Sequence, residues 1–102
     1  MKGFDKSKFE IEILSREYLN SKRVIREAEN SIIRYNSRKL ERSFRIVYHI
    51  EYVVESLDED DKFIIRNELM EGRRGDWYLS YFSPTAYYRH REKAYENFLH
   101  CL

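Results

Sequence analysis

The stretch from residue 4 to residue 71 contains neither glycine nor proline, and this absence constrains the fold more than any other feature. The whole chain of 102 residues has three glycines and one proline. A β-sandwich or barrel needs a turn about every 8–12 residues, and turns depend on these two residue types. We therefore expect an all-α protein, with a few long helices in one compact unit.

The first half of the chain carries a heptad pattern. Its seam, with alternating spacings of three and four, consists of Ile11, Leu14, Tyr18, Ser21, Ile25, Ala28, Ile32 and Tyr35. This a/d spacing is typical of a coiled coil. The seam has two interpretations. It packs in the core of the chain, or it forms an oligomer interface. The interface would use Ile11, Leu14, Tyr18, Ile25, Ile32 and Tyr35.

A second helical stripe begins after Asn36-Ser37, and it consists of Leu40, Phe44, Val47, Ile50, Val54 and Leu57. Asn36 is expected to end the first helix in a left-handed conformation, and Ser37 is expected to cap the second. The sequence thus predicts a coiled-coil-like helical hairpin over residues 1–57, which would oligomerise or bind a partner. The competing interpretation is one continuous helix of about fifty residues, which would need a partner chain.

A three-helix segment is predicted over residues 58–102. The acidic run 58–61 suits the positive end of a helix dipole, so a third helix is expected to start there and to end at Gly72. A loop then contains Arg73 and Arg74, which would either hold a phosphate or lie in solvent.

The last helix has the clearest start in the chain. Asp76 is expected to cap a short helix over residues 77–82. Ser83 and Pro84 then give an N-cap followed by proline at the first helical position, with the helix running towards Leu99. Arginine, lysine and tyrosine near a helix N-terminus are what a recognition helix presents to a major groove.

Residues 82–94, which read FSPTAYYRHREKA, resemble the second half of a helix-turn-helix of the sigma-factor region 4 type. With the stretch from Leu57 to Asp61, the layout is similar to phage transcriptional regulators of the ArpU/RinA kind. The resemblance implies that Thr85, Ala86, Tyr88 and Arg89 face base edges, that Arg91 and Lys93 lie nearer the backbone, and that Tyr87, Ala94 and Phe98 are core. The predicted DNA-binding set is therefore Arg73, Arg74, Ser83, Thr85, Ala86, Tyr88, Arg89, Arg91 and Lys93.

Charge and composition exclude other classes. The net charge of +1 gives no bulk attraction to polyanions, and an acidic block over residues 58–71 separates two mildly basic ones. Cys101 is the single cysteine, so no intramolecular disulfide is expected, and a cytoplasmic protein without a membrane span is predicted. The three histidines lack metal-site spacing, and no glycine loop or nucleophile elbow is present. We expect no metal, cofactor, small-molecule substrate or catalysis.

Together with this resemblance, the sequence predicts a transcriptional regulator of phage or mobile-element type. It would bind double-stranded DNA, as a homodimer, through the C-terminal helix. Two alternatives remain open at this point. One is a protein-interaction module with a degenerate helix-turn-helix that docks on RNA polymerase or another regulator, and the other is a homo-oligomeric helical protein whose seam is only structural.

Overall fold

The computed structural model of the chain describes residues 3–30 and 36–102. The regular structure of these residues is entirely helical, without a strand. Four α-helices, α1 (Gly3–Asn30), α2 (Ser37–Glu55), α3 (Glu59–Ile65) and α4 (Pro84–Cys101), are joined by a π-helical turn η1 (Arg66–Met70) and a 3-10 turn η2 (Trp77–Ser80). None of the described helices is long and apolar enough to cross a membrane.

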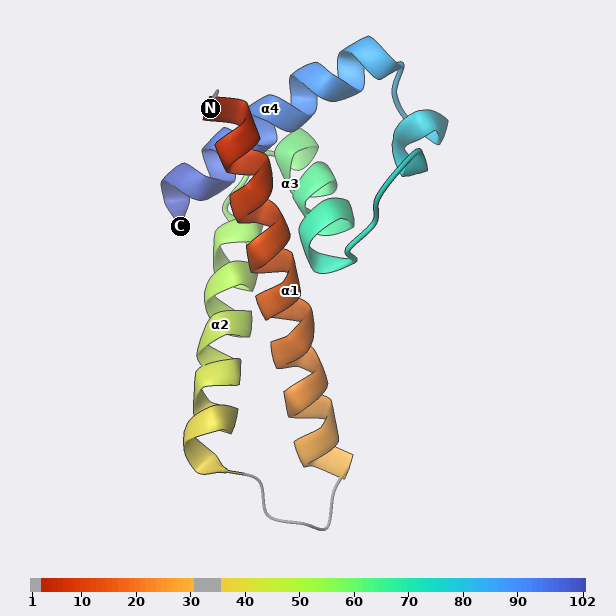
Figure 1. The fold of residues 1–102 in the computed structure, drawn as a ribbon. Helices are drawn as coiled ribbons and strands as arrows, with labels where there is room; N and C mark the ends of the chain where they lie inside the picture. The colour runs from red at the N-terminus through yellow and green to blue at the C-terminus, as the bar shows by residue number, and fades with distance from the viewer. Residues whose placement is uncertain (1–2, 31–35) are drawn as a thin grey trace.

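The helices α1 and α2 form the predicted hairpin, which makes the long axis of the molecule (Figure 1). The helix α4 crosses the end of this hairpin that is remote from Asn30 and Ser37, and α3 packs beneath α4 (Figure 1). One hydrophobic core unites all four helices, with Ile11, Ile50, Ile64 and Phe98 among its members. The prediction of an all-α fold with an N-terminal hairpin is confirmed.

The heptad seam of α1 lies mainly inside the chain. Ile11, Tyr18 and Ser21 are buried, and Leu14 and Ile25 pack against the core as partly buried residues. The last two seam positions, Ile32 and Tyr35, lie outside the described residues. The described part of the predicted oligomer interface is therefore used in packing within one chain.

The start of α2 differs from the prediction in which residue caps it. Asn36 is the N-cap, with extended backbone angles of φ −61° and ψ 117°. Its Oδ1 accepts hydrogen bonds from the backbone N–H groups of Arg38 at 2.9 Å and Lys39 at 3.2 Å. Ser37 is already the first helical residue. The left-handed conformation predicted for Asn36 and the capping role predicted for Ser37 were both wrong, because the asparagine amide itself satisfies the free N–H groups of the helix start.

The acidic run starts α3 as predicted, with Glu59, Asp60 and Asp61 in the first turn. The helix then widens into η1 before it ends, which the sequence pattern did not predict. Gly72 follows with a φ of +67°, the left-handed conformation that favours glycine at a helix end. A Cβ at this position would lie 3.0 Å from Cδ1 of Leu19, so α1 approaches the turn closely.

The start of α4 is confirmed. Ser83 has extended backbone angles, its Oγ accepts a hydrogen bond from the Ala86 N–H at 3.3 Å, and Pro84 is the first helical residue. The preceding helix predicted over residues 77–82 was wrong in type and length, because only the single turn η2 forms. Asp76 makes no side-chain cap bond there. The helix predicted to precede α4 in the helix-turn-helix is thus one 3-10 turn.

Candidate functional site

A buried carboxylate anchors the candidate site. Glu68 of η1 is 4% exposed, and its oxygens accept hydrogen bonds from the hydroxyls of Tyr87 and Tyr95 and from Trp77 Nε1 at 2.9 Å. These donors come from α4 and η2, so one side chain ties three elements together. Sequence reasoning missed Glu68, because Glu68 and Glu71 both flank the apolar pair Leu69 and Met70, and only the fold separates the buried residue from the exposed one.

The two tyrosines that bond Glu68 are held in their neutral form. Burial raises the pKa of the Tyr95 hydroxyl far above its usual range, and the negative charge and hydrogen bond of Glu68 add to this. Burial and the hydrogen bond to Glu68 likewise raise the pKa of Tyr87. Both phenols therefore act as permanent donors to the carboxylate at physiological pH.

Aromatic rings fix η2 against α4. The ring of Tyr78 stacks on that of Tyr87, with centroids 3.6 Å apart and planes 1° from parallel. Trp77 meets Tyr87 edge-on, with centroids 6.0 Å apart. Phe63 of α3 lies against Tyr81, with ring centroids 5.0 Å apart. This packing explains why the segment before α4 forms a tight turn in place of a longer helix: its rings are shared between two neighbouring helices.

Arg91, predicted to lie near the DNA backbone, is half-buried in the same cluster. Its guanidinium carbon lies 5.6 Å from the ring centroids of Tyr87 and Tyr88 and 5.5 Å from that of Tyr95. Its Nη1 donates a hydrogen bond to the Tyr87 hydroxyl at 3.2 Å. The arginine therefore rigidifies α4 through cation–π contacts as well as carrying charge.

The other predicted DNA-binding residues divide into two groups. Five of them on or beside α4 are exposed, namely Ser83, Thr85, Tyr88, Arg89 and Lys93, whereas Ala86 is half-buried. The side chain of Tyr88 is 53% exposed. Tyr87, Ala94 and Phe98, which the resemblance placed in the core, are buried as predicted.

Partners within the chain distinguish the exposed cations. Lys93 Nζ lies 3.9 Å from Oδ1 of Asp61, a buried carboxylate of α3 whose Oδ2 accepts from Asn97 at 2.7 Å. Arg74 Nη1 donates to the main-chain oxygens of Glu68 at 2.9 Å and Arg73 at 3.0 Å. Within residues 3–30 and 36–102, the side chains of Arg73 and Arg89 make no hydrogen bond or ion pair, so both can meet a ligand.

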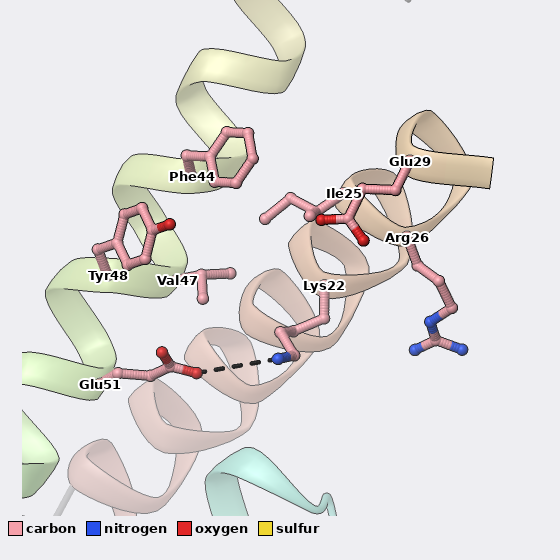
Figure 2. A pocket seen from close by; sticks show the side chains of 8 residues that line it. All are labelled: Lys22, Ile25, Arg26, Glu29, Phe44, Val47, Tyr48 and Glu51. Carbon is pink, nitrogen blue, oxygen red and sulfur yellow. Dashed lines mark ion pairs between the residues drawn. The ribbon is translucent and has the colours of Figure 1, made fainter. Parts of the chain in front are cut away.

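A hollow lies between α1 and α2, lined by residues 22–29 and 44–51 (Figure 2). It has a volume of about 300 Å³, and the side chains of Ile25 and Val47 lie between the two helices there. Lys22 Nζ reaches to 3.9 Å from Glu51 Oε2 across it, while Arg26 points away (Figure 2). Because charges of both signs line this open hollow, it offers no selective attraction for one kind of ligand.

No group of three or more histidine, cysteine or acidic side chains is placed to hold a metal ion among the residues that the structure describes. Comparison with protein-family models, with curated proteins and with solved structures gave no match to this chain. Function is therefore inferred from the chain's own residues.

Proposed function

We propose that this protein binds double-stranded DNA in a sequence-specific manner and regulates transcription, with α4 in the major groove. The observation that carries the proposal is the exposure of Tyr88 and Arg89 on the first half of a helix whose start is fixed by Ser83 and Pro84. A capped helix with an exposed arginine near its N-terminus has the chemistry to read a guanine edge while its N-terminal N–H groups approach a phosphate.

The position of α4 supports this proposal. Its first half projects beyond the α1–α2 hairpin, at the end of the molecule opposite Asn30 and Ser37 (Figure 1). The contacts of Glu68, Tyr87 and Arg91 hold that half against η1 and η2. Groups that read bases need a rigid scaffold, because a loose site loses both affinity and discrimination.

Each side chain then has a distinct role. Arg89 would pair with a guanine, and Thr85 and Tyr88 would contact neighbouring base edges. Lys93 would meet the phosphate backbone, in exchange for its long contact with Asp61. Because these phosphate contacts are few, the proposal includes a homodimer on two half-sites, in which two copies of α4 share the binding.

The experiment begins with duplexes enriched from a random pool by the purified protein. Arg89→Ala is expected to lower affinity for the enriched duplex by about 1–3 kcal/mol and to relax its base preference. Lys93→Ala should weaken binding to all duplexes alike, because a phosphate contact carries no sequence information. Fluorescence anisotropy at fixed salt measures both effects.

Arg38→Ala is the matched control, because Arg38 is an exposed arginine in the first turn of α2, near the closed end of the hairpin. It should leave affinity unchanged. No enrichment of any duplex at low salt, or equal losses for Arg89→Ala and Arg38→Ala, would contradict the proposal. Sedimentation of the complex tests the dimer, which requires two chains per duplex.

A second candidate function is docking on RNA polymerase or another regulator. It is favoured by the exposed side chains of η2 and the following residue, since Leu79 is 54% exposed and Tyr81 is 60% exposed. Tyrosine and arginine are enriched in the centres of protein interfaces. In this case Leu79→Ser and Tyr81→Ser would lower the affinity for purified RNA polymerase. Arg89→Ala would not change any base preference in DNA binding.

A further inference from the structure

One cavity connects α1 with the arginine loop and with α4. It has a volume of about 140 Å³, and four cationic side chains line it: Lys8 of α1, Arg73 and Arg74 of the loop, and Arg91 of α4. Two carboxylates, Glu12 and Glu68, line it as well. The formal charge around the cavity is therefore +2, in a chain whose total charge is only +1.

Two of the four cations, Arg74 and Arg91, are held in place by the fold. The guanidinium of Arg74 is fixed by the main-chain oxygens of Glu68 and Arg73. That of Arg91 lies against the rings of Tyr87 and Tyr95. Binding an anion would therefore cost these two arginines little conformational entropy.

The carboxylate of Glu68 competes less for these arginines than a carboxylate without hydrogen-bond donors would. Both of its oxygens already accept hydrogen bonds, from Tyr87, Tyr95 and Trp77. Lys8 is exposed on α1 and makes no ion pair with the described residues, so its ammonium can reach a ligand. With Glu12 and Glu68 both counted, the lining of the cavity keeps a formal charge of +2.

From this charge and size we infer that the cavity binds a phosphate group, with Lys8 as its ligand from α1. The volume is well below the roughly 300–1,000 Å³ of clefts that enclose drug-sized molecules, so a small anionic group fits better than a whole organic ligand. Arginine forks match the oxygens of phosphate, and lysine adds a point charge.

The phosphate could belong to a DNA backbone or be free in solution. The DNA source rests on the proposed function: Arg91 also lies 5.6 Å from the ring of the exposed Tyr88, so the cavity continues the proposed α4 interface. The phosphate site itself does not rest on that function, because its cations converge with or without DNA.

The test titrates the isotope-labelled full chain with inorganic phosphate, against sodium chloride at equal ionic strength, and follows backbone amide resonances by NMR. Saturable shifts are expected for residues 73–75. In Lys8→Gln the affinity should fall about tenfold, which corresponds to about 1.4 kcal/mol, because one charge-assisted contact to the anion is lost. Lys6→Gln is the matched control, because Lys6 is an exposed lysine of α1 that does not line the cavity.

Shifts that never saturate, or an equal loss of affinity in Lys6→Gln, would overturn the phosphate site. The second arm measures binding to the enriched duplex at several salt concentrations. If the source is DNA, Lys8→Gln lowers the salt slope by about one, while Lys6→Gln leaves it unchanged. An unchanged slope beside lost phosphate binding supports the site and identifies free phosphate as its ligand.

The two proposals can fail separately. Saturable phosphate binding without any DNA binding would overturn the proposed function and leave the site standing. Specific DNA binding without a phosphate response would do the reverse.

Discussion

At the residue level, the hydrogen bonds of Glu68 connect η1 with α4 and η2. Burying a carboxylate is costly unless hydrogen bonds replace its water, and Glu68 receives bonds from Tyr87, Tyr95 and Trp77. The sequence could not predict this arrangement, because the donors follow Glu68 by 9 to 27 residues and only the folded chain brings them together. The sequence also could not show that Arg74 donates a hydrogen bond to the main chain of Glu68, or that Arg91 donates one to the Tyr87 hydroxyl.

Removing this carboxylate should destabilise the fold strongly. Glu68→Ala is expected to lower the free energy of unfolding by about 3–5 kcal/mol, because two buried hydroxyls and the half-buried Trp77 N–H lose their acceptor. Urea unfolding measures the loss. Glu71→Ala is the control, since Glu71 is exposed at the end of the same turn and should change stability by less than about 0.5 kcal/mol. Similar losses in the two variants would show that the hydrogen bonds of Glu68 do not contribute more to stability than an exposed glutamate does.

The raised pKa values predict sensitivity to alkali. Free tyrosine ionises near pH ~10, whereas burial, with the hydrogen bonds of Glu68 or Glu51, raises the pKa of Tyr87, Tyr95 and Tyr18. Above this pH the unfolded chain holds fewer protons than the folded chain, so stability falls as the pH rises. Below about pH 9 these tyrosines contribute no pH dependence to stability.

Urea unfolding across this alkaline range measures the slope of stability against pH. The variant Tyr87→Phe should lower stability and flatten the slope, since it removes one of the perturbed phenols. Tyr52→Phe is the control, because Tyr52 is 77% exposed, and it should keep the native slope. A slope that is the same in all three proteins would count against the account of the buried phenols.

At the scale of the elements, local chemistry predicted some helix starts and missed others. Ser83 and Pro84 start α4 as expected, because the serine hydroxyl caps a backbone N–H and proline suits the first helical position. For α2, both Asn36 and Ser37 can cap a helix, and residue type alone did not decide between them. The turn η2 was predicted as a longer helix because aromatic residues suit either structure until their packing partners are known.

The correction at α2 can be tested directly. Asn36→Ala should lower the free energy of unfolding by about 1 kcal/mol, since two backbone N–H groups lose their acceptor. Ser37→Ala should be close to neutral, because Ser37 is exposed and already helical. Thermal unfolding of both variants distinguishes the two caps. The opposite order of effects would restore Ser37 as the cap.

At the scale of the whole molecule, the absence of breakers over residues 4–71 and the heptad seam together predicted the all-α fold and its hairpin. The seam could not by itself predict its partner, because an a/d stripe packs equally well on its own chain or on another. The sequence also predicted the exposed residues of α4, but Lys8 lies more than sixty residues from Arg73 and joins it only through the fold.

The proposed reading of DNA by the first half of α4 can be followed by NMR of the labelled protein with its enriched duplex. The largest amide shifts on adding the duplex are expected within residues 83–93, with smaller ones at residues 73–75. Arg89→Ala should abolish the preference for the enriched duplex over a scrambled one. Shifts centred on the hollow between α1 and α2, or no shifts at low salt, would contradict the claim.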